Sequence, residues 1–203
     1  MSVRVKICGI TRTTDALAAI AAGADALGFM FYPPSPRHLE PEAARTIITA
    51  LPPLVARVGV FVNPTEAFVR QAIAAGVDTL QFHGEETPEF CGRFGLKTIK
   101  AFRVRNVDSL AECPRHPESA WLLDSFVPGQ PGGTGACFNW ELAKTAAQAH
   151  TIILAGGLTP QNVAEAVRQV RPYAVDVSSG VEATPGQKDT AKIRAFIDAA
   201  KGV

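Results

Sequence analysis

The amino-acid sequence predicts an α/β fold, a single-domain (β/α)8 barrel of the TIM-barrel type that spans residues 1–203. Short apolar, β-branched segments alternate eight times with longer alanine-rich segments of helical period, the pattern of parallel strands joined by helices. AGADALGF at residues 22–29 also resembles AGVDTLQF at residues 75–82, 53 residues later. A repeat of two strand–helix units favours a closed barrel over an open doubly wound sheet, because alternate strands of a barrel supply the same inner layer. A length of 203 residues suits one domain.

The expected strands lie at residues 3–8, 26–31, 58–62, 79–83, 98–104, 121–124, 151–155 and 174–177. The expected helices lie at residues 15–22, 42–50, 66–75, 88–94, 108–112, 140–148, 162–170 and 189–201. Pro41 suits the first turn of the second helix, and Thr87 before Pro88 is a typical cap for the fourth. The fifth helix is the shortest, because prolines between residues 113 and 117 interrupt it.

Composition limits the partners and the cellular setting. The formal net charge is +1, which indicates neither a nucleic-acid nor a membrane footprint. The first residues lack the apolar run of a signal peptide, and no window approaches the ~18 apolar residues of a membrane span. The four cysteines, Cys8, Cys91, Cys113 and Cys137, form no Cys-x-x-Cys pair, so a disulfide framework is not expected. We therefore expect a cytoplasmic protein.

Polar side chains are expected at one end of the barrel, where the strands end and barrels keep their chemistry. Because side chains alternate between the two faces of a strand, Cys8, His83 and Asp124 should point inward at the ends of the first, fourth and sixth strands. Asp176 does the same near the end of the eighth. We expect these four residues to converge on one rim, where thiol, imidazole and carboxyl groups can perform acid–base chemistry.

Simpler interpretations exist for each of these residues. A buried cysteine is commonly a small apolar side chain, and a histidine or aspartate at a strand end commonly caps a loop. Cys8, His83 and Asp124 are also zinc-ligating types, but no local ligand spacing joins them, so we expect no metal. The convergence of four such residues on one rim favours catalysis.

Glycine-rich turns follow the seventh and eighth expected strands. Gly156 and Gly157 follow the seventh, and Ser179 and Gly180 follow the eighth. Barrels frequently bind phosphate at these two loops, where glycines let backbone N–H groups approach the anion. The alternative is a pair of tight turns without a ligand, but two such signatures at the two appropriate strands favour a phosphate site.

Two longer loops follow the second and sixth strands. Arg37 follows a proline-stiffened stretch, and a fixed guanidinium suits a carboxylate ligand, although a solvated surface arginine fits the sequence equally well. The glycine- and proline-rich stretch 126–139 is the longest loop on the expected active face. It suits a lid over a bound ligand, and it equally suits a loop without that role.

At these residues the sequence resembles, from end to end, the phosphoribosylanthranilate isomerase family. The shared motifs are KICGIT at residues 6–11, GFMFY at 28–32, SPR at 35–37, GVFVN at 59–63, QFHGE at 81–85, LDS at 123–125, GGTG at 132–135, GGL at 156–158 and VDVSSGVE at 175–182. Each motif occurs in the family's order and at the expected strand, and the first and last are the most specific. The small (β/α)8 barrel of the family agrees with the fold expected from the pattern of segments.

The resemblance implies an Amadori rearrangement in tryptophan biosynthesis. N-(5-phosphoribosyl)anthranilate would become 1-(2-carboxyphenylamino)-1-deoxyribulose 5-phosphate, with no cofactor and no metal. The family's general acid corresponds to Asp124, which should have its pKa raised by an apolar barrel mouth. The general base corresponds to Cys8 as thiolate, and we expect Lys6 to help lower the pKa of that thiol.

The resemblance also implies how the substrate's two anions are held. Arg37 would bind the anthranilate carboxylate, while His83 and Asp176 would orient the reacting centre. The phosphate would lie on the backbone amides of Gly156, Gly157, Ser179 and Gly180.

Two other function classes share parts of this pattern. A histidine-pathway isomerase or a thiamine phosphate synthase would use the same phosphate loops, but the former is usually longer and has an aspartate in place of Cys8. A catalytically silent phosphate-ligand sensor would need neither Cys8 nor Asp124, since folds of this type serve many functions. The sequence leaves open whether the protein is a monomer or a homodimer.

Overall fold

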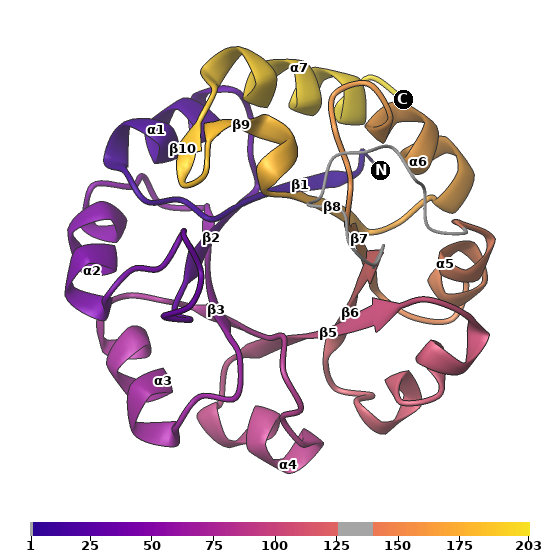
Figure 1. Ribbon diagram of the computed structural model, residues 1–203, viewed down its shortest axis with the longest axis horizontal. Helices are drawn as coiled ribbons and strands as arrows, with labels where there is room; N and C mark the ends of the chain where they lie inside the picture. Colours follow the sequence, from indigo (N-terminus) through magenta and orange to yellow (C-terminus); the bar gives the residue numbers. More distant parts are fainter. Residues whose placement is uncertain (1, 126–139) are drawn as a thin grey trace.

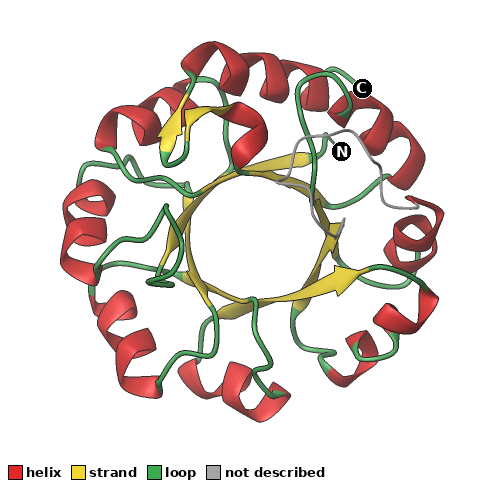
Figure 2. Cartoon of the chain, in the orientation of Figure 1, coloured by secondary structure: helices red, strands yellow, loops and turns green. Residues whose placement is uncertain are grey.

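The structure, a computed structural model, describes residues 2–125 and 140–203. Eight parallel strands, β1 to β8, close into one barrel in chain order, with β8 hydrogen-bonded to β1. Helices surround the barrel as an outer ring, and loops connect them to the strands (Figures 1 and 2). The prediction of a (β/α)8 barrel is therefore confirmed, and the open doubly wound alternative is excluded.

The strands occupy nearly the expected positions: β1 Arg4–Cys8, β2 Ala26–Met30, β3 Ala56–Phe61, β4 Thr79–Phe82, β5 Lys97–Val104, β6 Ala120–Ser125, β7 Ile152–Ala155 and β8 Ala174–Val177. The α-helices are α1 Thr13–Ala21, α2 Pro41–Thr49, α3 Glu66–Ala74, α4 Pro88–Cys91, α5 Trp140–Ala147, α6 Val163–Val170 and α7 Thr190–Lys201. Pro41 occupies the first turn of α2 as expected, and the Thr87 side chain caps α4 by accepting a hydrogen bond from Phe90 N–H. Among the described residues, none of these helices is both long enough and apolar enough to span a bilayer.

The prediction of a fifth α-helix at residues 108–112 is wrong. Two short 3-10 helices, η2 Val107–Leu110 and η3 Cys113–Arg115, cover that side of the barrel instead. Asn106 and Ser109 form a reciprocal capping box at the start of η2. The fourth expected helix is also shorter than predicted, because α4 passes into the 3-10 helix η1 Gly92–Phe94.

A small hairpin after β8 was not predicted. The 3-10 helix η4, Ser179–Val181, leads into β9, Glu182–Thr184, which pairs antiparallel with β10, Gln187–Lys188. Figure 1 shows this hairpin beside the end of β1, outside the barrel wall. Strands of three and two residues are too short to show an alternating pattern, so the sequence does not predict this hairpin.

The sequence repeat has a structural cause. Gly23 and Gly76 end the turns after α1 and α3 with φ angles of +102° and +107°, which only glycine adopts readily. Two residues later, Asp25 and Asp78 each accept a hydrogen bond from a backbone N–H near the start of the preceding strand, at 2.8 and 2.9 Å. Each aspartate therefore fastens one strand to the strand before it at the amino-terminal end of the barrel.

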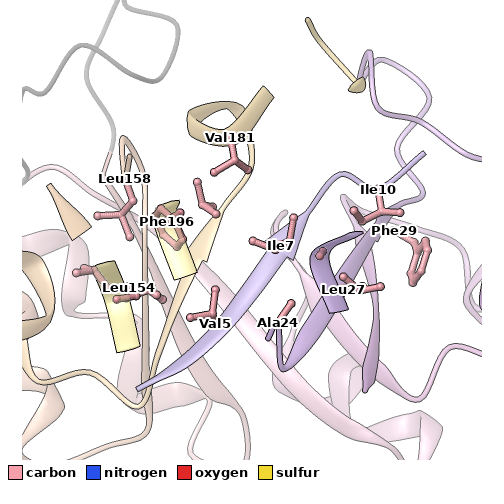
Figure 3. Packing of buried hydrophobic residues seen from close by; sticks show 14 of the residues in the cluster. Val5, Ile7, Ile10, Ala24, Leu27, Phe29, Leu154, Leu158, Val181 and Phe196 are labelled. Atoms are coloured by element: carbon pink, nitrogen blue, oxygen red, sulfur yellow. The ribbon is translucent and has the colours of Figure 1, made fainter. Parts of the chain in front are cut away.

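Alternating side chains build two apolar layers. Outward residues such as Ile7, Leu27 and Phe29 pack beneath the helices, and Phe196 of α7 covers the same layer (Figure 3). Inward residues, including Val58, Ile99, Leu122 and Ile153, fill the barrel interior as a separate cluster. Burying a leucine or phenylalanine stabilises the fold by roughly 1.5–3 kcal/mol each, so these layers supply much of the driving force that positions the strand ends.

Candidate active site

The end of β1 and the end of β8 bring a thiol, an amine and a carboxylate together. Lys6 Nζ lies 2.8 Å from Asp176 Oδ1, and both side chains are almost fully buried. Cys8, two residues further along β1, is 5% exposed. A Cβ atom at Gly28 of the neighbouring strand β2 would lie 2.7 Å from Cys8 Sγ, so glycine leaves the space that the thiol occupies.

Burial and neighbouring charges act in opposite directions on the pKa of Cys8 and on that of Lys6. Burial raises the pKa of the Cys8 thiol, and the nearby positive charge of Lys6 offsets that effect only in part. Burial alone would lower the pKa of Lys6, but the charges of Asp176 and Cys8 outweigh it, and the pKa of Lys6 is raised. Lys6 thus acts on Cys8 in the predicted direction, whereas the predicted net lowering of the thiol pKa is wrong.

A second pair lies across the same end of the barrel. Asp124 near the end of β6 and His83 just after β4 approach to 3.4 Å between Oδ2 and Nε2. The His83 backbone N–H donates to Phe61 C=O at 2.8 Å, which fixes the ring's point of attachment. The Asp124 side chain is 32% exposed, so its surroundings are more open than the apolar mouth expected from the sequence.

Arg37 is not a free surface cation. Its Nε and Nη2 donate to the two carboxylate oxygens of Glu182 at 2.8 and 2.6 Å, a bidentate pair. Glu182 also accepts from Lys188 Nζ at 2.8 Å, and Lys188 donates to Ser178 C=O at 3.1 Å. The Arg37 side chain passes directly over Gly9, where a Cβ would lie 2.5 Å from Arg37 Cδ, and so reaches the neighbourhood of Cys8.

The charges in this chain of contacts compensate one another. Burial favours the neutral form of Glu182, but the hydrogen bonds from Arg37 and Lys188 outweigh it, and the pKa of Glu182 is lowered. Burial lowers the pKa of Lys188 despite its bond to Glu182. Glu182 lies in the VDVSSGVE motif, from which no role could be assigned to it. No local pattern in the sequence marks Lys188.

The two predicted phosphate loops lie against each other. Gly156 and Gly157 have φ angles of +83° and +64°, and the Asn162 side chain secures their turn by donating to Gly157 C=O at 3.0 Å. A Cβ at Gly180 would collide with the carbonyl oxygen of Leu158, so the second loop packs directly on the first. Short glycine turns that meet in this way expose backbone N–H groups that can face an anion.

One further cation stands at this rim without having been predicted. Arg103 of β5 is in register with Asp124 of β6, so both side chains lie on the inner face of the barrel wall. Arg103 is exposed and makes no hydrogen bond or ion pair within residues 2–125 and 140–203. Within the same residues, no group of three His, Cys, Asp or Glu side chains has the arrangement of a metal site.

The structure therefore brings the predicted residues to one end of the barrel as two groups. Cys8, Asp176 and Arg37 lie around β1, β2 and β8, whereas His83 follows β4 and Asp124 lies on β6. The two glycine loops follow β7 and β8, so they lie between Asp124 and Cys8 around the barrel. The stretch 126–139, which the sequence offered as a lid, lies outside the described residues, as does Cys137. A closed (β/α)8 barrel that carries a thiol, carboxylates, a histidine and glycine loops at the carboxyl end of its strands has the architecture of the TIM-barrel enzymes.

Comparison with known proteins identifies the family. The family model of N-(5'-phosphoribosyl)anthranilate isomerase matches residues 5–199. The isomerase of Geobacter sulfurreducens is 54% identical over 201 residues, covering 98% of this chain and 99% of the relative. The crystal structure of phosphoribosyl anthranilate isomerase from Thermotoga maritima superposes with a TM-score of 0.93 at 46% identity, covering 99% of this chain and all of that one. A complex of such an isomerase with reduced 1-(o-carboxyphenylamino)-1-deoxyribulose 5-phosphate gives a TM-score of 0.90 at 44% identity, with 99% of this chain and 100% of that one covered.

The chain belongs to the phosphoribosylanthranilate isomerase family. Its activity is the isomerisation of N-(5'-phosphoribosyl)anthranilate in tryptophan biosynthesis. This confirms the activity that the sequence motifs implied, and it excludes the histidine-pathway, thiamine and sensor alternatives as the main function.

Proposed function

We propose that Cys8 is the general base and Asp124 the general acid of this isomerisation. The observation that carries the proposal is their placement: the thiol ends β1 and the carboxyl group nearly ends β6 at the same mouth of one closed barrel. Each has its own polar partner, Lys6 with Asp176 for the thiol and the His83 ring for the carboxyl group. A substrate ribose between the two strands would have one proton donor and one proton acceptor at hand.

The first step opens the furanose ring. Asp124 donates its proton to the ring oxygen while the bond between C1 and that oxygen breaks, and the nitrogen lone pair forms the Schiff base at C1. Asp124 becomes a carboxylate in this step, and a protonated His83 at 3.4 Å would stabilise it.

The second step removes the proton from C2. The Cys8 thiolate accepts it, and the electron pair of the C2–H bond moves toward the Schiff base to give an enolamine. Tautomerisation then removes the hydroxyl proton at C2 and adds a proton at C1, which yields the ketose. No proton is gained or lost overall, as an isomerisation requires.

The charge balance around the thiol supports its role as base, although burial raises its pKa. Lys6, Arg37 and Lys188 supply three positive charges, while Asp176 and Glu182 supply two negative charges. A thiolate at Cys8 would neutralise the remaining charge. The buried cations therefore offset part of the effect of burial on the pKa of the thiol, and a thiolate whose pKa stays raised is a strong base toward the C2 proton.

The phosphate and the carboxylate of the substrate would bind to different parts of the site. The phosphate fits the joined loops at Gly156–Gly157 and Ser179–Gly180, whose backbone amides and absence of side chains allow close approach. The anthranilate carboxylate fits Arg37, whose Nη1 makes no hydrogen bond within the described part of the chain. Glu182 holds the other two nitrogens, so the guanidinium is already oriented before the substrate binds.

The oligomeric state and the cellular compartment of the enzyme are also proposed. A relative from Thermotoga maritima is described as dimeric, and for this chain either a monomer or a homodimer is consistent with the sequence. Sedimentation velocity across a hundredfold concentration range would distinguish the two. We place the enzyme in the cytoplasm, where a reduced Cys8 thiol is maintained.

The test of function follows the loss of anthranilate fluorescence after enzyme is added to freshly made N-(5'-phosphoribosyl)anthranilate. We expect first-order loss whose rate is proportional to enzyme concentration. The aminoaldose of the histidine pathway, assayed in parallel, should not be converted. Turnover of that second compound at a similar rate would contradict an assignment to the tryptophan pathway alone.

A further inference from the structure

A buried ion pair beside His83 has no part in the chemistry described above. Glu86, in the loop before α4, and Lys100 of β5 lie 3.0 Å apart, with side chains 3% and 5% exposed. Burying two charges is costly, and an apolar pair of similar volume would often stabilise a fold as well. The pair therefore calls for a role other than stability.

Both charges converge on one residue of the backbone. Lys100 Nζ donates to Gly84 C=O at 2.6 Å, while Glu86 accepts from Gly84 N–H at 3.0 Å. Glu86 also accepts from Asn63 N–H at 2.7 Å, which ties the same loop to the end of β3. A Cβ at Gly84 would collide with the Asn63 side chain, so the loop is packed closely as well as bonded.

Gly84 directly follows His83 along the chain. The His83 N–H is held by Phe61 C=O at 2.8 Å, and the next residue is held at both its N–H and its C=O. The backbone is thus fixed on each side of the His83 side chain. From that base the His83 ring reaches Asp124 with Nε2 3.4 Å from Oδ2.

We infer that Glu86 and Lys100 are positioning residues that hold His83 against the catalytic carboxyl group of Asp124. The inference rests on the proposed role of Asp124 as general acid. Neither Glu86 nor Lys100 touches the reacting atoms; each acts through the peptide groups of Gly84. Loss of either charge should let the loop shift, so that His83 no longer keeps its separation from Asp124.

The first experiment needs no turnover. The chain has four histidines, so the ring resonances can be assigned by substitution and followed by NMR at one pH near neutrality. Asp124→Asn should move the His83 ring resonances because an amide replaces the carboxyl group beside the ring. We expect Lys100→Met and Glu86→Gln to move them in the same direction, and Lys100→Met to add little once Asp124→Asn is present.

The control is the ion pair of Arg57 and Asp78 at the opposite end of the barrel, where Arg57 Nε lies 2.7 Å from Asp78 Oδ2. Arg57→Met should leave the His83 resonances in place. Glu86→Gln keeps the shape and hydrogen-bonding atoms of the side chain, so it serves where Lys100→Met folds poorly. Unmoved His83 resonances in either folded variant would overturn the inference.

The second experiment is a double-mutant cycle on kcat. Lys100→Met should lower kcat about tenfold with KM changed less than twofold, and in a His83→Ala background the same substitution should change kcat less than twofold. An equal loss in both backgrounds would show that Lys100 acts independently of His83 and would overturn the inference. Absence of turnover in the unaltered enzyme would instead contradict the proposed function, and the NMR result would still decide the inference.

Discussion

The two ends of the barrel are built from the same eight strands but use polar side chains in different ways. At the amino-terminal mouth, small inward residues, among them Ala26, Ala56, Ala120 and Ala174, line a cavity of about 580 Å³. The carboxylates there, Asp25 and Asp78, bind backbone N–H groups and fasten neighbouring strands. At the carboxyl-terminal end, three nearly buried ion pairs lie close to the strand ends: Lys6–Asp176, Glu182–Lys188 and Glu86–Lys100.

The difference separates groups that stabilise the fold from groups that prepare chemistry. A carboxylate that accepts a backbone hydrogen bond satisfies a donor that would otherwise be unpaired, and this favours folding. A buried ion pair gains little net stability, because desolvation of both charges opposes their attraction. Within the described residues, the carboxyl-terminal end holds three of them, and each lies beside a residue with a proposed part in the reaction: Cys8, Arg37 or His83. Substitutions at the two ends should therefore differ in kind, with activity lost at one end and stability at the other.

The largest effect is expected from Cys8→Ser. A serine hydroxyl is a far weaker acid than a thiol, so the anionic base is lost and kcat should fall by about 10³-fold. Steady-state fluorescence kinetics measure this, with the melting temperature as a check on folding. Cys113→Ser is the matched control, because burial raises the pKa of that remote thiol to about 12 and it should be inert. A Cys8→Ser enzyme with more than a tenth of normal kcat would remove the thiol from the mechanism.

Asp124→Asn should come next, with a loss of about 10²-fold in kcat, because an amide cannot donate the proton that opens the ring. KM should change little, since we assign neither anion of the substrate to this carboxyl group. The comparison at the other end is Asp25→Asn, which should lower the melting temperature while leaving kcat within twofold. Equal losses of activity in the two variants would break the distinction between the two ends.

Glu182→Gln should raise KM about tenfold with a smaller change in kcat. The variant loses the charge-assisted bonds that orient Arg37, which typically contribute about 1.5–3 kcal/mol. The increase should be much smaller for a substrate analogue without the anthranilate carboxylate. Equal increases for both compounds would show that Arg37 binds some other part of the substrate.

The same glutamate should affect stability in acid. Its pKa is lowered in the folded protein, so its contribution is present above its unfolded pKa of about 4.3 and disappears as pH falls through the lower folded value. Chemical denaturation between pH 3 and pH 7 should show that the Glu182→Gln variant loses less stability on acidification than the unaltered enzyme. Parallel curves for the two proteins would mean that Glu182 is not held as a carboxylate.

The smallest effect is expected where an alanine lines the amino-terminal cavity. Ala56→Val adds two methyl groups to open space, and stability should change by less than about 1 kcal/mol. The value of kcat should stay within twofold, because the change lies at the far end of β3 from the site. A strong loss of activity would show that the two ends of the barrel are coupled.

The parts that the sequence predicted are those governed by local periodicity. Alternation along the strands placed Cys8 and Asp124 on the inner face, and the repeat of residues 22–29 at residues 75–82 favoured a closed barrel. The fifth helix failed because Asn106 and Pro114 favour short 3-10 turns, a local choice that apolar spacing does not reveal.

The parts that escaped prediction are contacts between residues distant in sequence. Arg37 and Glu182 are 145 positions apart, and no local pattern indicates that the arginine meets a glutamate before it meets a substrate. The contact of Lys188 with Glu182 and the ion pair of Glu86 with Lys100 were not predicted for the same reason. The direction of the Cys8 pKa was also wrong, because one adjacent lysine can be read from a sequence while the extent of burial cannot.

The division of labour between Cys8 and Asp124 is tested most directly by the primary isotope effect on kcat with substrate deuterated at C2. If Cys8 breaks the C2–H bond, the effect should be larger in Cys8→Ser than in the unaltered enzyme, because that step then limits the rate. If Asp124 opens the ring beforehand, the effect should fall toward one in Asp124→Asn. The reverse pattern, with a full effect in Asp124→Asn and none in Cys8→Ser, would contradict both assigned roles.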